Sequence, residues 1–228
     1  MGNAAAKEAI DTTPLGDGKL EDSKIIAPGL VTTAATVLKG KNKLWVIEES
    51  DATFFTFKSK GLFRTHSLVE DATGTVVATV ITKKTGLASS TNYICKSTPT
   101  FEGQEKLDAE QLKKSGIDEG VELYAFGIID TKLTMASAKS TYSVITGKEG
   151  DDFALTEVYT AEKLSAMNFY AMFKQGDTLV AKAHMKGMTM FPTLEVATGV
   201  DVLAIVCIGN TLVGDSSSAG AMAGAGVI

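Results

Sequence analysis

The sequence predicts a mainly β domain that carries one buried helix near its C-terminus. Two observations support the β class: short runs of aromatic and β-branched residues recur between residues 44 and 196, and the chain contains 22 glycines that suit many turns. A third observation is a wholly apolar segment within residues 198–213, which differs from every other run in the chain. About ten to twelve short strands separated by turns are typical of a sandwich or a barrel.

The strand signals begin at residue 44, with the runs K-L-W-V-I-E-E and T-F-F-T-F-K. Residues 62–70 and 75–82 predict a hairpin, because the D-A-T-G between them has the residues of a tight turn. Further strands are expected at residues 92–96, 121–129, 141–146, 152–159, 169–173, 178–184 and 193–196.

One surface helix is expected within residues 107–116. Asp108 suits the N-cap position, Gln111 follows it by three residues, and Gly116 is a natural C-terminal stop. The polar composition of this segment predicts a short, solvated helix.

The apolar run V-L-A-I-V-C-I, residues 202–208, has no polar side and therefore predicts a helix buried on every side. A buried strand is the alternative, because a short apolar run does not reveal its period. We favour the helix, because Asp201 is an acid suited to its first turn. The segment falls short of the roughly 20 apolar residues that span a bilayer.

The two ends of the chain lack these signals. Residues 1–40 predict a loosely ordered arm, since T-T-P-L-G-D-G and A-P-G interrupt any period, and residues 215–228 predict a flexible tail of small residues. Residues 41–214 are then one domain.

Composition limits the function classes. The net charge of −5 argues against a nucleic-acid partner, although residues 58–96 alone carry six basic and two acidic residues, or +4. Cys95 and Cys207 lie in apolar runs, and with two histidines they make no ordinary zinc site. We expect no metal, no cofactor and no enzymatic activity, since no catalytic set of side chains can be assembled. The composition fits the cytoplasm.

Several motifs resemble the tubby C-terminal-like superfamily and its LURP-one-related branch, and their order along the chain supports the resemblance. T91-N92-Y93-I94 resembles the S-N-Y strand of tubby domains, the hairpin of residues 62–80 resembles a repeated LURP-one-related unit, and A-T-G-V-D-V-L-A-I-V-C-I, residues 197–208, resembles that branch's end. The resemblance implies a closed antiparallel β-barrel of about 12 strands around the C-terminal helix.

The resemblance also implies binding to an anionic phospholipid headgroup. Asn92 matches a headgroup residue of tubby, whereas the later G-K-L-R strand corresponds to Gly127–Asp130, where Ile128 and Asp130 replace the two cations. A phosphate needs charge-assisted donors, so inheritance of that site is not expected. The remaining candidate lipid contacts, with Asn92, are Lys58, Lys60, Lys83 and Lys84.

The start M-G-N-A-A-A-K suggests N-myristoylation of Gly2, although Ala6 stands where the usual Ser or Thr would be. One acyl chain binds a membrane only marginally, and the cationic segment would supply the second signal.

Two hypotheses follow. In the first, the chain is a non-enzymatic tubby-like module that contacts anionic phospholipid at the cytoplasmic face of a membrane. In the second, it is a structural or protein-interaction subunit on the same fold, with no lipid ligand.

Overall fold

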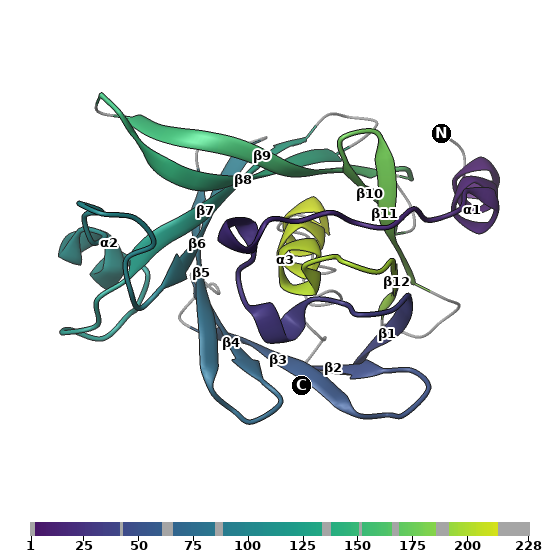
Figure 1. Ribbon diagram of the computed structural model, residues 1–228, viewed down its shortest axis with the longest axis horizontal. Helices are drawn as coiled ribbons and strands as arrows, with labels where there is room; N and C mark the ends of the chain where they lie inside the picture. The colour runs from purple at the N-terminus through teal and green to yellow at the C-terminus, as the bar shows by residue number, and fades with distance from the viewer. Residues whose placement is uncertain are drawn as a thin grey trace.

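The computed structural model describes residues 3–41, 43–60, 66–84, 89–133, 138–150, 152–165, 169–185 and 192–213. Its strands form one closed ring, and a helix lies in the middle of that ring (Figure 1). The predicted fold class, a closed antiparallel barrel around a buried C-terminal helix, is confirmed.

The barrel has 12 strands. They are β1 (Thr36–Lys41), β2 (Leu44–Ile47), β3 (Thr53–Lys60), β4 (His66–Asp71), β5 (Val76–Lys84), β6 (Ser89–Lys96), β7 (Tyr124–Leu133), β8 (Ala138–Glu149), β9 (Asp152–Lys163), β10 (Tyr170–Gln175), β11 (Thr178–Met185) and β12 (Pro192–Val196).

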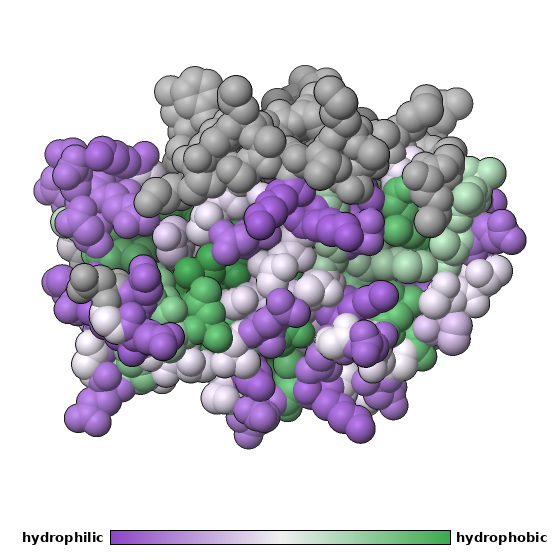
Figure 2. Space-filling model, turned by 90° about the horizontal axis from the view of Figure 1, so that it is seen from above, coloured by the Kyte–Doolittle hydropathy of each residue, from purple (hydrophilic) through white to green (hydrophobic). Residues whose placement is uncertain are grey.

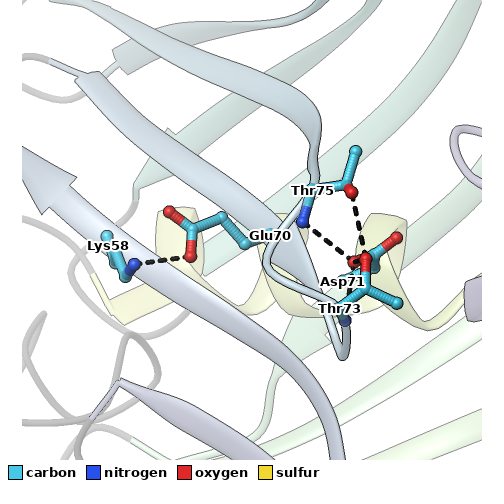
Figure 3. Close-up of polar contacts among 5 residues, drawn as sticks. All are labelled: Lys58, Glu70, Asp71, Thr73 and Thr75. Atoms are coloured by element: carbon cyan, nitrogen blue, oxygen red, sulfur yellow. Dashed lines mark hydrogen bonds and ion pairs between the residues drawn. The ribbon is translucent and has the colours of Figure 1, made fainter.

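Each strand pairs with its neighbour in the sequence, and β1 pairs antiparallel with β12 to close the ring. The predicted hairpin is β4–β5. Its turn is held by Asp71, whose Oδ1 accepts hydrogen bonds from the backbone N–H groups of Thr73 and Thr75, at 2.8 and 3.0 Å (Figure 3). The turn residues thus act as their chemistry predicts.

The central helix α3 spans Val202–Val213 and provides the middle of the core. Every residue from Val202 to Ile208 is at most 1% exposed. The predicted helix is therefore confirmed, and the strand alternative is wrong. Asp201 lies just before the first turn as an N-cap, because its Oδ1 accepts a hydrogen bond from the N–H of Ala204 at 3.2 Å.

The second expected helix is α2, Ala109–Lys114. Asp108 caps it by accepting hydrogen bonds from the N–H groups of Glu110 and Gln111, and Gly116 follows with a positive φ of 72°. This helix belongs to a long connection between β6 and β7, residues 97–123, which lies outside the barrel (Figure 1).

The N-terminal segment is packed against the barrel, whereas we expected a loosely ordered arm. Helix α1 (Asn3–Thr12) lies against the outer wall with Ala6 and Ile10 buried, and two short 3-10 helices, η1 (Asp22–Lys24) and η2 (Pro28–Leu30), lie on the chain that crosses one end of the barrel (Figure 1). Strand β1 also begins within the predicted arm, at Thr36. These contacts could not be predicted from the sequence, because hydrogen bonds to its backbone mainly hold the arm in place.

We call residues 13–35 the strap, and the end of the barrel that they cross the mouth. The predicted C-terminal tail, 215–228, lies outside the described residues.

Large apolar side chains on the surface are scattered. Leu44, Val76 and Leu155 are exposed on three different strands, and Val121 is exposed in the connection between β6 and β7. On the face seen in Figure 2, hydrophobic residues form small separate areas among hydrophilic ones. Such scattered exposed residues, taken over the part of the chain that the structure describes, are ordinary on a folded protein.

Candidate functional site

The two strands that carry the tubby-like motifs are neighbours in the barrel. Asn92 on β6 pairs with Ile129 on β7, and Thr91 pairs with Asp130. Both motifs therefore lie in strands, as the sequence predicts. They do not, however, form one site.

The relevant side chains lie on opposite faces of the barrel wall. Asn92 shares a face with Ile94, because side chains alternate along a strand, and it is buried in the interior at 4% exposure. Asp130 is exposed on the outer face, where it accepts a hydrogen bond from the hydroxyl of Thr91 at 2.8 Å. Ile128 packs into an outer apolar cluster. No headgroup can therefore contact all three positions at once.

The glycine of the G-I-I-D strand has a packing role. A Cβ on Gly127 would lie 2.6 Å from the ring of Tyr142 on β8, so a larger residue there would displace that ring. Tyr142 stacks on Tyr159, with ring centroids 6.3 Å apart.

The four candidate lysines are only partly described. Lys58 forms an ion pair with Glu70 on the adjacent strand, at 2.5 Å, so its charge is already partnered (Figure 3). The side chains of Lys60, Lys83 and Lys84 lie outside the described residues, as does Gly2. The backbone of Lys83 pairs with Thr91.

Residues 97–123 cover part of the outer wall at β5 and β6. Ile81 and Cys95 from the wall form one apolar cluster with Leu112 and Leu123 from this connection. Next to this cluster, the ring Nδ1–H of His66 donates a hydrogen bond to the carbonyl oxygen of Ser115, at 2.6 Å.

The covering connection is acidic. It carries three lysines and seven acidic residues, or −4, whereas the +4 of residues 58–96 is a sum over the sequence that includes basic side chains outside the described residues.

The barrel interior changes character towards the C-terminal end of α3. Thr131, Ser140 and Thr211 form a chain of hydroxyl contacts, at 2.7 and 3.0 Å, between the wall and the helix. The side-chain amide of Asn210 is buried there and makes no hydrogen bond among the described residues. This end is polar, whereas the first two turns of α3 pack in an apolar core.

The mouth, at the other end of α3, holds the strap by an unusual charged contact. The ammonium of Lys96 donates a hydrogen bond to the carbonyl oxygen of Ile25 at 3.2 Å, and Oδ2 of Asp201 accepts one from the N–H of Ile26 at 2.6 Å. These two atoms belong to the same peptide group. A positive and a negative side chain therefore hydrogen-bond the same peptide group, one at its C=O and the other at its N–H. Such charge-assisted hydrogen bonds are stronger than hydrogen bonds between neutral groups.

Further backbone contacts fix the rest of the strap. The hydroxyl of Thr32 donates to the carbonyl oxygen of Ala197 at 2.5 Å and accepts from the N–H of Val200 at 3.0 Å. The N–H of Gly18 donates to the carbonyl oxygen of Thr198 at 2.8 Å. At the rim, the side-chain amide of Gln175 bonds both the N–H and the carbonyl of Lys19.

Burial sets the electrostatics of the mouth. It raises the pKa of Asp201 to about 6, although hydrogen bonds from backbone N–H groups and the charge of Lys96 oppose the shift. Burial also lowers the pKa of Lys96, and the negative charge of Asp201 opposes that change. The ammonium also lies 3.9 Å from the ring centroid of Phe126.

Only one local sequence pattern indicates a residue of the mouth. Asp201 is the single acid beside an apolar helix, and we assigned it to that helix alone. Lys96 and Thr32 carry no local pattern, because their partners lie 71 and 165 residues away along the chain. A contact over such distances follows from the closure of the barrel.

No protein-family model, curated protein or solved structure matches this chain. The tubby-like resemblance therefore stays a prediction. Within the described ranges, no three His, Cys, Asp or Glu side chains are grouped so that they could hold a metal ion. None of the helices in those ranges has both the length and the apolar character needed to cross a membrane.

Proposed function

We propose that this chain is a non-enzymatic tubby-like module of the cytoplasm that works through contacts with another protein. The observation that supports this proposal over a lipid ligand is the acidic connection of residues 97–123, net charge −4, which packs on the outer wall at Ile81 and Cys95. An anionic membrane surface attracts basic segments and repels acidic ones, and this effect falls off within about a Debye length, roughly 10 Å at moderate salt.

A second candidate is attachment to anionic phospholipid at the cytoplasmic face of a membrane. The start of the chain favours it, because an acyl group on Gly2 would directly precede α1. In this candidate Lys60, Lys83, Lys84 and Asn92 remain the proposed contacts. The interior position of Asn92 and the ion pair of Lys58 weaken it.

Vesicle flotation separates the two candidates. The full chain is mixed with vesicles of phosphatidylcholine alone, or of phosphatidylcholine with phosphatidylserine or phosphatidylinositol bisphosphate. We expect no flotation with any of them, and in a membrane-free extract of the source cells we expect elution within a complex larger than the chain.

A matched pair of charge reversals makes the test specific. Lys83→Glu with Lys84→Glu changes the proposed lipid contacts, whereas Lys113→Glu with Lys114→Glu changes a neighbouring exposed pair on α2. Flotation on anionic vesicles that only the first pair abolishes would overturn the protein-contact proposal. Intact-mass spectrometry of the native protein reports a myristoyl group on Gly2, which would support the membrane candidate.

A further inference from the structure

The barrel is complete without the strap. Its ring closes through β1 and β12, and the strap adds no strand to the ring. Only four side chains of the strap are buried: Ile26, Ala27, Leu30 and Thr32. The mouth is thus a surface of the barrel that receives a segment of chain, in the way that a binding site receives a ligand.

The mouth recognises the backbone of that segment more than its side chains. Lys96 and Asp201 grip the peptide group between Ile25 and Ile26, and the backbone of Val31 forms a β-bridge with Asp201. Main-chain hydrogen bonds with a few side-chain pockets are how proteins commonly bind extended peptides.

Three positions make the fit selective. Ile26 and Leu30 enter the apolar core. Gly18 passes so close to Gly199 that a Cβ on Gly18 would lie 2.6 Å from the carbonyl oxygen of Gly199. A matching segment therefore needs two apolar side chains four positions apart, and a glycine eight positions before the first. The strap of this chain meets that need.

The strap also has a natural hinge. Thr33, Ala34 and Ala35 are exposed and join it to β1. When an element at the end of a chain is joined by an exposed connection, exchanging it between two identical copies is a low-cost route to a dimer, because every contact is re-formed.

We propose that the mouth of the barrel is a binding site for a peptide segment, filled here by the chain's own strap, and that the strap of a second copy takes the same place. This inference goes beyond the proposed function, because the partner at this site is another copy of the chain.

Crosslinking between two differently tagged full-length chains tests the exchange. One chain carries Lys19→Cys on the strap and the other Gln175→Cys at the rim, two positions in hydrogen-bond contact. The native Cys95 and Cys207 are buried, so a short bismaleimide reacts at the new thiols. After incubation together at high concentration, we expect a covalent heterodimer of the two tagged chains.

Two controls fix the meaning of that product. A chain with both substitutions must crosslink within itself, because the strap then lies at its own mouth. Pairing Lys19→Cys with Glu157→Cys, an exposed position on β9, measures random collision. A heterodimer yield no higher than this collision level overturns the proposal, and so does a double variant that crosslinks neither within itself nor to a second copy.

Two glycine substitutions test whether the close approach of Gly18 to Gly199 affects the rate of strap exchange. Gly18→Ala forces the strap away from Gly199, whereas Gly29→Ala places its Cβ in open space, with no atom within 4 Å. We expect Gly18→Ala to speed heterodimer formation about tenfold, because relief of a backbone clash favours release. Gly29→Ala should match the parent chain, and equal rates for both variants would contradict the role given to Gly18.

Discussion

Helices α2 and α3 begin alike and differ in everything that follows. Each is preceded by an aspartate that accepts hydrogen bonds from backbone N–H groups of the first turn, Asp108 for α2 and Asp201 for α3. Asp108 does this in solvent at the surface. Asp201 is fully buried, and it also holds Ile26 of the strap.

The hydrogen bonds of an N-cap are local, whereas the free-energy cost of the capping carboxylate depends on its surroundings. A carboxylate in water keeps its hydration and gains hydrogen bonds, so capping is favourable at little cost. A buried carboxylate has lost its hydration, and its hydrogen bonds only partly replace what was lost. Asp201 can therefore connect helix, wall and strap, but its charge destabilises the folded state relative to its protonated form.

The greatest loss of stability is expected from a substitution in the buried face of α3, and the matching substitution in α2 should cost less. Leu203→Ala on α3 should lower the free energy of unfolding by about 3–5 kcal/mol, because Leu203 is fully buried and the wall around it cannot collapse. Leu112→Ala on α2 should cost about 2 kcal/mol, since its small outer cluster can relax. Urea denaturation of both variants measures this difference, and equal losses would contradict it.

The next prediction concerns the pH dependence of stability that the buried cap Asp201 causes. Burial raises the pKa of Asp201 to about 6 in the folded chain, from an ordinary value of 3.8. A raised folded-state pKa stabilises the fold below pH 4, and this contribution is lost as the pH rises through 6. Relative to Asp201→Asn, the parent chain should thus lose on the order of 3 kcal/mol between pH 4 and pH 7.

Urea denaturation across that pH range gives the comparison, because all other groups titrate in both chains. Parallel stability curves would mean that Asp201 titrates normally. The Asp108→Asn variant serves as the exposed control.

The smallest effect concerns the cap of α2. Asp108→Ala should destabilise the chain by about 1 kcal/mol, because the N–H groups of Glu110 and Gln111 then bond only to water. Hydrogen exchange of these two amides should become faster, while the amides of α3 keep their protection. Faster exchange in α3 as well would show that the two helices are coupled.

Much of the fold could be predicted because its signals are local. The turn at Asp71 and the cap at Asp108 act within four residues, and the apolar run of α3 declares its burial by composition alone. Strand β1 could not be predicted in the same way. The run T-V-L-K-G-K becomes a strand through its pairing with β2 and β12, and β12 lies at the other end of the chain.

The same distinction between local signals and contacts of distant segments applies to the candidate sites. Pairing of the T-N-Y-I strand with G-I-I-D could be expected from their order, but the face on which each side chain lies depends on register. The grip of Lys96 and Asp201 on one peptide group needs three distant segments, and no short pattern records it.

Gly127 has a consequence for any attempt to redesign the barrel. It is small because the ring of Tyr142 fills the space beside it, and that ring stacks on Tyr159, whose hydroxyl accepts a hydrogen bond from the backbone N–H of Asp201. A larger residue at position 127 would therefore disturb a line of contacts that runs from the wall to the start of α3 and on to Ile26 of the strap. Packing alone accounts for the glycine of the G-I-I-D strand, so a likeness at this position informs about the wall and carries no information about a ligand.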